Sequence, residues 1–231
     1  MNLGRGVERL AQSLLASPAS RPVRRVNTRE NVVALTFDDG PDPLTTPRLL
    51  DILAGHGASA TFFLIGEPAS RYPDLVARIA AEGHVVANHT WDHPDLTDAS
   101  VAVCRDQIER CAAALGPTGA RFFRPPYGRL PRSLRRTVAA LGYTAIKWDV
   151  SSEDWQGHDA AAIAHSIESQ MTTGSIVLCH DGLYGSAPPG SADRTPTLRA
   201  VDQVLERGSK LYRFVTISEL LGLGLPSRQP N

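Results

Sequence analysis

From residue 31 onward, short runs of apolar and β-branched residues alternate with segments in which apolar residues recur at helical spacing. The short runs predict seven strands, at 32–37, 60–65, 85–88, 122–124, 144–149, 175–179 and 212–216. The amphipathic segments predict seven helices, at 47–53, 74–82, 99–115, 131–141, 159–170, 196–207 and 217–223. Strict alternation implies parallel strands joined by crossover helices. Seven such units favour an α/β fold of the (β/α) barrel type over an open sheet, in a single domain.

Residues 1–28 lie outside this alternation. Apolar residues near the N-terminus follow helical spacing and predict a short amphipathic helix, at Leu3, Val7, Leu10 and Leu14. Residues 17–27 are typical of a linker, and we place the domain at 29–224 with a C-terminal tail at 225–231. The segment has no secretory apolar core and no membrane span. We therefore expect a cytoplasmic protein without an integral membrane segment, with an extracellular or cell-wall location as the alternative.

The composition excludes several classes of protein. The 231 residues are 42% hydrophobic and 21% charged, which is globular, and three cysteines exclude a disulfide scaffold. Basic and acidic residues are equal at 24 each, so nothing indicates a nucleic-acid partner, and no obligatory protein partner is evident. Only two of the basic residues are lysines, Lys147 and Lys210. We interpret this bias as codon usage rather than anion recognition.

Polar side chains end or directly follow five of the predicted strands, at Asp38-Asp39, His89, Arg124, Asp149 and His180-Asp181. In parallel α/β folds the carboxyl ends of the strands meet at one rim, and that rim carries the chemistry. We therefore expect these side chains to form one site.

The first two clusters suggest a metal site. Asp38 and Asp39 stand where a strand enters a turn, and consecutive strand residues point to opposite sides, so the two carboxylates suit different tasks. A simple Asp-Gly turn is the alternative. His89 and His93 are spaced i, i+4, and on one helical turn both imidazoles can bind a metal, although such spacing also arises by chance. With a carboxylate they make a set that leaves open positions, as catalytic metals require.

The remaining clusters suggest acid–base chemistry. Arg124 precedes two prolines, which restrict the backbone, and an arginine held in this way can pair with a carboxylate. A surface turn is the alternative. His180 ends a buried strand, where an imidazole can act as a general acid near neutral pH or serve only a structural role.

Five strings in this order resemble one known family. They are T-F-D-D-G-P at 36–41, N-H-T-W-D-H-P at 88–94, R-P-P-Y-G at 124–128, D-W at 154–155 and L-C-H-D at 178–181. Together they resemble the polysaccharide deacetylase family, the NodB-homology domain of carbohydrate esterase family four, over residues 31–223. The resemblance implies a distorted (β/α) barrel.

The resemblance also implies a divalent metal held by Asp39, His89 and His93. The first aspartate, Asp38, would be the catalytic base, and Arg124 would orient it. Zn²⁺ is the metal that we expect, although imidazole and carboxylate ligands also suit Co, Ni or Fe.

For the other half of the reaction, the resemblance implies His180 as the catalytic acid and Asp154 as the carboxylate that tunes it. Trp155 and Leu178 would form the wall that accepts the acetyl methyl, and the backbone N–H of Tyr127 would help to hold the oxyanion. We expect base and acid to lie on opposite sides of the rim.

The implied function is metal-dependent hydrolysis of N-acetyl groups on an amino sugar, which is a polysaccharide, an oligosaccharide or a small N-acetylated sugar. An O-acetyl esterase and an inactive carbohydrate-binding module are the alternatives. One departure from the family pattern is Ser151, where an aspartate is frequent; Asp149, two residues earlier, is not an obvious replacement.

Overall fold

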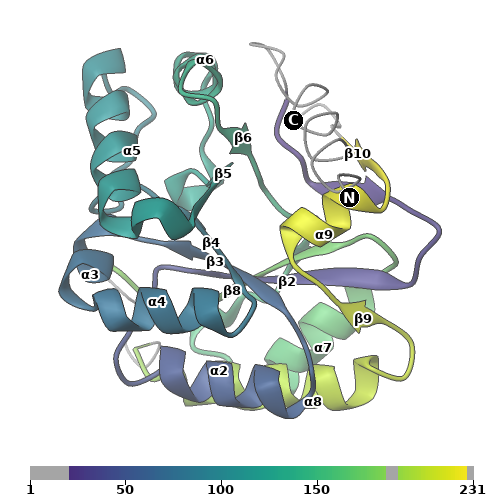
Figure 1. Ribbon diagram of the computed structural model, residues 1–231. Helices are drawn as coiled ribbons and strands as arrows, with labels where there is room; N and C mark the ends of the chain where they lie inside the picture. The colour runs from purple at the N-terminus through teal and green to yellow at the C-terminus, as the bar shows by residue number, and fades with distance from the viewer. Residues whose placement is uncertain (1–20, 186–191, 228–231) are drawn as a thin grey trace, which may run out of the picture.

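The computed structural model describes residues 21–185 and 192–227, so the helix expected near the N-terminus lies outside the described residues. A curled sheet forms the centre, with strand order β6-β5-β4-β3-β2-β8-β7 (Figure 1). In that order the strands are Thr144–Ala145, Gly119–Phe123, Val85–Asn88, Ala60–Leu64, Val32–Asp38, Ile176–His180 and Val150–Ser151. A further strand, β9 (Arg213–Phe214), pairs with the start of β2. All pairings in this sheet are parallel, as the alternation predicted.

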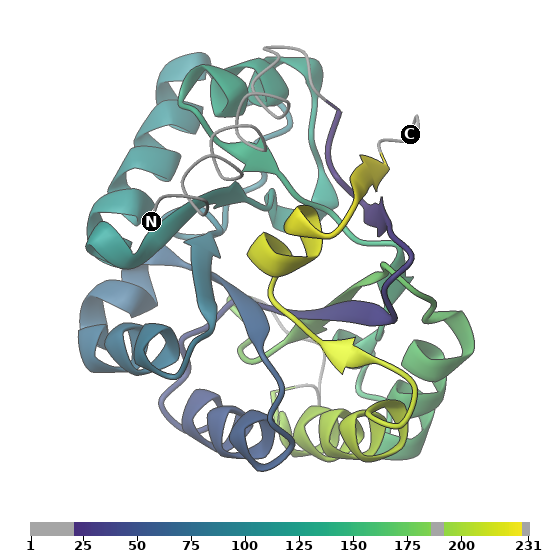
Figure 2. The same ribbon diagram turned by 45° about the vertical axis from the view of Figure 1, so that its right-hand side comes forward.

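Helices cover the outside of the sheet (Figures 1 and 2). They are α2 (Thr46–Gly55), α3 (Gly66–Arg71), α4 (Pro73–Ala81), α5 (Val101–Leu115), α6 (Arg132–Ala140), α7 (Ala160–Gln170), α8 (Thr195–Gly208) and α9 (Ile217–Gly222). Short 3-10 turns, η1 to η3, lie at Gly116–Thr118, Pro126–Gly128 and Asp154–Gln156. Helix α3 was not predicted, because its six residues are too few to show a helical period.

The strand β2 explains how the core positions the site. All seven of its residues are buried, as expected for a strand covered on both faces. Val33, Leu35 and Phe37 pack in the cluster that includes α2 and α8, whereas Val32 and Ala34 pack in the interior of the barrel. Because side chains alternate along a strand, Asp38 falls on the same side as Val32 and Ala34 and faces the interior.

The predicted strand at 144–149 is wrong in detail. Thr144–Ala145 pairs with β5, and Val150–Ser151 pairs with β8 at the other end of the sheet. Val23 joins the two parts, since its N–H donates to the carbonyl of Ala145 at 2.9 Å and its carbonyl accepts from the N–H of Lys147 at 2.8 Å. One stretch of chain thus changes neighbours and curls the sheet into a distorted barrel.

Short strands form in part of the expected linker and in part of the expected tail. Arg25–Asn27 (β1) and Leu225–Ser227 (β10) pair as an antiparallel two-stranded sheet. Val23 and Val26 are fully buried, which anchors this segment to the core. Among the described residues, no helix is both long and apolar enough to cross a membrane.

Candidate active site

Asp38 and His180 are partners across neighbouring strands. Asp38 ends β2, His180 ends β8, and the two residues are paired in the parallel register. Both side chains line the same pocket. We expected them on opposite sides of the rim, and this is wrong, because β8 returns beside β2 despite the separation of the strands in sequence.

Arg124 holds Asp38 from the interior of the barrel. Its Nη1 donates to Oδ1 of Asp38 at 2.6 Å and to the hydroxyl of Thr36 at 2.8 Å, and its Nη2 donates to the carbonyl of Lys147 at 3.2 Å. The guanidinium lies 4.0 Å from the centre of the Phe63 ring, and the arginine is fully buried. A buried guanidinium requires an ionic partner, so this pair fixes the orientation of the carboxylate.

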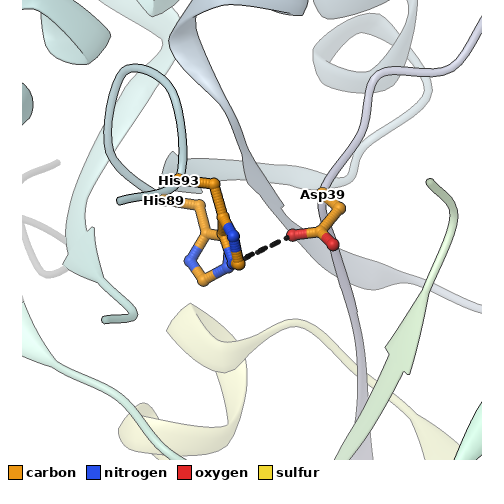
Figure 3. A group of neighbouring side chains, drawn as sticks. All are labelled: Asp39, His89 and His93. Atoms are coloured by element: carbon orange, nitrogen blue, oxygen red, sulfur yellow. Dashed lines mark ion pairs between the residues drawn. The ribbon is translucent and has the colours of Figure 1, made fainter. Parts of the chain in front are cut away.

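Asp39, His89 and His93 form a group whose ligand atoms lie within 4.8 Å of one another (Figure 3). Nε2 of His89 lies 3.4 Å from Oδ1 of Asp39, and Nε2 of His93 lies 3.5 Å from the same oxygen. That oxygen is buried and accepts no hydrogen bond from the residues that the structure describes. A buried carboxylate oxygen without a donor requires an explanation, and a bound cation provides one. Two imidazoles and a carboxylate are donors that suit a divalent transition metal.

The protonation of the two histidines is compatible with a metal. Nδ1 of His89 lies 2.7 Å from the carbonyl oxygen of Arg124, so Nδ1–H donates and Nε2 keeps its lone pair towards Asp39. Burial, together with the charge of His89, lowers the pKa of His93 to about 4. His93 is therefore neutral at neutral pH, and the neutral imidazole is the form that binds metals.

The histidine pair does not lie on a helical turn, contrary to our expectation. Residues 89–93 form a loop after β4, in which Thr90 and His93 have positive φ angles of 72° and 58°. Side-chain oxygens of Asn88 and Gln107 accept hydrogen bonds from amides of this loop. A loop that is fixed in this way, and not the period of a helix, brings the two imidazoles together.

His180 and Asp154 form a second ionic group in the pocket. Nδ1 of His180 lies 2.8 Å from Oδ1 of Asp154, and the backbone N–H of His180 donates to Oδ2 at 2.9 Å. Burial alone lowers the pKa of His180, but the charge and hydrogen bond of Asp154, with the charges of Asp39 and Asp38, raise it to about 9. The imidazole is therefore protonated at neutral pH.

No sequence pattern indicates two further members of this group. Arg194 is buried, and its Nη2 donates to Oδ2 of Asp154 at 2.5 Å and to the hydroxyl of Thr197 at 2.7 Å. Thr197 also donates to Oδ2 of Asp154, at 3.1 Å. Arg194 faces inward just before α8. An arginine that precedes a helix is indistinguishable, by pattern alone, from a surface residue.

The departure at Ser151 leaves its position without a carboxylate. Ser151 lies in β7 beside Leu178, and its carbonyl accepts the hydroxyl of Ser166 at 2.9 Å. Asp149 does not replace the missing acid, because its carboxylate accepts from the N–H of Ile176 at 2.8 Å and from the hydroxyl of Ser175 at 3.1 Å. Arg194 and Thr197 complete the frame around Asp154 without it.

A pocket of about 340 Å³ joins the two ionic groups, within the usual size range of ligand sites. Asp38, Asp39 and the three histidines of the two groups all line it. Trp155 and Leu178 line it beside His180, and the Trp155 ring meets the imidazole edge-on at 5.3 Å between centres. The sequence did not indicate two other aromatic residues of the wall, Trp148 and Tyr184.

Tyr127 stands at the mouth of this pocket with a positive φ of 57°. Its ring packs edge-on against His93 at 4.7 Å between centres, and the residue is 60% exposed. Within 21–185 and 192–227, its backbone N–H donates to no acceptor. A free N–H beside the metal-binding group suits an oxyanion.

Comparison with known proteins agrees with this geometry. The family profile described as Polysaccharide deacetylase matches residues 25–146. A peptidoglycan-N-acetylglucosamine deacetylase of Bacillus cereus is 38% identical over 192 residues, which are 81% of this chain and 67% of the relative. The chain belongs to the polysaccharide deacetylase family.

Two further relatives of this polysaccharide deacetylase extend the comparison. A chitooligosaccharide deacetylase of Bradyrhizobium sp. is 38% identical over 75% of this chain and 82% of its own. The crystal structure of a peptidoglycan N-acetylglucosamine deacetylase, solved with a benzamide ligand, superposes with a TM-score of 0.79 at 33% identity. That match covers 91% of this chain and 96% of the solved one. The distorted barrel predicted from the sequence is therefore confirmed.

Proposed function

We propose that this polysaccharide deacetylase removes N-acetyl groups from amino sugars by metal-dependent hydrolysis. The observation that carries the proposal is that Asp38, His180 and the group of Asp39, His89 and His93 line one pocket. A base, an acid and a candidate metal site in one cavity are what hydrolysis of an unreactive amide requires.

Asp39, His89 and His93 would hold the metal, and Zn²⁺ is the ion that we propose. Two neutral imidazoles and one carboxylate suit Zn²⁺, and they also suit Co, Ni or Fe. When bound there, the ion polarises the acetamide carbonyl and lowers the pKa of water.

Asp38 is the proposed base. Arg124 holds Oδ1, which leaves Oδ2 nearer the metal-binding group, 3.7 Å from Nε2 of His89. From this place Oδ2 accepts the proton of the attacking water. The backbone N–H of Tyr127 then donates to the oxygen that becomes negative as the carbon turns tetrahedral.

His180 is the proposed acid, and it transfers its proton to the departing amine. An amine expelled without a proton is a poor leaving group, so the acid must be charged before bond cleavage. Asp154 stabilises the charged imidazolium, and Trp155 with Leu178 forms the apolar surface against which the acetyl methyl would pack.

Acetate release from N-acetylglucosamine oligomers tests the proposal directly. The purified chain, loaded with Zn²⁺, should release acetate and expose free amines, and removal of metal with a chelator should stop both. An O-acetylated xylan, assayed in parallel, tests the esterase alternative. Release of acetate from the xylan alone would identify an esterase, and binding of oligomers without release would identify an inactive module.

A further inference from the structure

One stretch of the chain is strongly cationic although the whole chain is balanced. Basic and acidic residues number 24 each over 231 residues. From Arg110 to Trp148 inclusive there are seven arginines and one lysine, and no aspartate or glutamate. Codon usage explains arginine in place of lysine, but it does not explain the absence of carboxylates from this stretch.

The cationic stretch forms one side of the active-site pocket. Pro125, Tyr127, Gly128 and Trp148 line the pocket, and the chain then leads from Gly128 into α6. The guanidinium of Arg129 lies 5.6 Å from the centre of the Tyr127 ring. The cations that follow Arg129 therefore extend from the mouth of the pocket.

Helix α6 directs two of its three arginines outward. Leu134, Thr137 and Val138 are buried, and the two apolar residues pack in a core cluster with residues of β5 and α5. Arg132 and Arg136 are exposed on the opposite face. They are four residues apart, so they lie one turn, roughly 6 Å, from each other along the helix. Figure 1 shows this helix beyond β5 and β6, away from the helices beneath the sheet.

Nearby carboxylates do not neutralise this face. On the neighbouring helix α5, Glu109 pairs with Arg105, and Asp106 pairs with Arg110. Asp95 pairs with Arg129. No carboxylate of residues 21–185 or 192–227 lies within 4.0 Å of a nitrogen of the exposed arginines of α6.

We propose that Arg132 and Arg136, the α6 arginine stripe, bind carboxylates of an acidic N-acetylated glycan while its acetamide occupies the pocket. The inference rests on the proposed function and narrows its substrate class from N-acetylated glycans in general to those that bear acidic groups. A guanidinium can donate two parallel hydrogen bonds to a carboxylate. The stripe begins three residues after Arg129, which lies against Tyr127 of the pocket wall, on the side where a glycan longer than the pocket would emerge.

A membrane surface and a nucleic acid fit these observations less well. The apolar residues of α6 are buried in the core, so the helix has no apolar face to insert into lipid. The balanced total charge is not that of a domain that tracks a phosphate backbone.

The test compares three tetrasaccharides of equal length. The first is chitotetraose, which is neutral. The second, the acid form, alternates N-acetylglucosamine with N-acetylmuramic acid and bears free carboxylates. The third, the capped form, is the same tetrasaccharide with its carboxylates converted to methyl amides. For the native chain we expect kcat/KM on the acid to exceed that on the capped form by about tenfold at low salt. Added salt should reduce this preference, because exposed charges are screened.

Arg132→Gln and Arg136→Gln should each reduce the preference about two- to fivefold, and together they should nearly abolish it. Activity on chitotetraose should stay unchanged. Arg213→Gln, at the opposite ends of the strands on β9, removes the same charge and is the matched control. Equilibrium binding of the acid and capped tetrasaccharides to the native and doubly substituted chains gives a second readout that does not depend on turnover.

Equal kcat/KM and equal binding for the acid and capped forms would overturn the inference and leave the deacetylase proposal intact. A preference that survives the double substitution would also overturn it. If no substrate released acetate, the proposed function would fail. The binding comparison would still show whether the stripe binds the acid form more tightly than the capped form. The inference would also be overturned if phosphatidylglycerol vesicles bound to the chain through these arginines while the two substitutions left the glycan preference unchanged. The ligand of the stripe would then be a membrane surface and not a glycan.

Discussion

Nη1 of Arg124 lies 2.6 Å from Oδ1 of Asp38, and both residues are buried. The contact joins the end of β2 to the residue that follows β5, on the far side of two intervening strands. The orientation of the proposed base is therefore set from inside the barrel, and solvent does not compete for the guanidinium. Replacing one residue of the pair leaves the other as a buried charge without a partner. The structural and catalytic effects of the pair can therefore be distinguished only by changing both residues.

Asp38→Asn should reduce kcat/KM by roughly 10²–10⁴-fold, the range for a positioned proton acceptor. It should also lower the free energy of unfolding by about 3 kcal/mol or more, because Arg124 keeps a buried charge without an ionic partner. Asp38→Asn combined with Arg124→Met removes both charges and should recover much of the stability without recovering activity. Acetate release and denaturant unfolding distinguish the two effects. Activity within a few-fold of the native chain would show that another group activates the water.

Changing both His89 and His93 to Ala should reduce bound Zn²⁺ from one ion per chain to nearly none. The two side chains supply two of the three donors in the group. His165→Ala, an exposed change on α7, is the matched control and should retain the metal. Elemental analysis after dialysis measures the stoichiometry. Full occupancy in the doubly substituted chain would place the metal elsewhere.

The pH profile of kcat/KM should lose activity on its basic side as His180 loses its proton. The pKa of this imidazole is raised to about 9, chiefly by Asp154 against the effect of burial. A bound divalent cation neutralises Asp39 and moves the basic limb below that value. Asp154→Asn removes the charge that favours the imidazolium, so the limb should move to lower pH.

His180→Ala supplies the control for this profile. It should cost roughly 10²–10⁴-fold and remove the basic limb that belongs to the imidazole. An unchanged limb in Asp154→Asn would break the link between the two residues. An unchanged limb in His180→Ala would exclude His180 as the acid.

Gly174→Ala should destabilise the chain more than Gly57→Ala. Both glycines have positive φ, 82° and 61°, where an L side chain costs about 1–2 kcal/mol. A Cβ at Gly174 would also lie 1.9 Å from the carbonyl oxygen of Val26 in β1, whereas one at Gly57 would meet nothing within 4 Å. Thermal unfolding of both variants measures the difference. Equal shifts in Tm would mean that β1 moves away at little cost.

Most of the central sheet could be predicted from sequence because its strands are buried on both faces and read as continuous apolar runs. The short elements could not. Arg25–Asn27 and Leu225–Ser227 have three residues each and pair only with one another, so no local period marks them. Thr144–Ala145 and Val150–Ser151 lie in one apolar run, and their separation into two strands depends on Val23, which is distant in sequence.

The residues of the candidate site were largely named from sequence, but their geometry was not. Asp39, His93 and Tyr127 all have positive φ, a conformation that tertiary contacts impose and that residue type does not signal. Arg194 was missed because its role depends on a carboxylate forty positions away. Asp38 and His180 are neighbours because β2 and β8 are adjacent in the sheet, and a local sequence pattern does not reveal the order of strands.

The pairing of Asp38 with His180 has a consequence for how this enzyme can be altered. A slip of one residue between β2 and β8 would place Cys179 or Asp181 opposite Asp38, so the whole ladder of main-chain hydrogen bonds maintains the spacing of the proposed base and the proposed acid. Tyr127 and Trp155 lie in short turns between the regular elements, which vary in length and sequence more readily. Substitutions in those turns would change the pocket wall, and with it the glycans that bind, while the spacing between Asp38 and His180 stays the same.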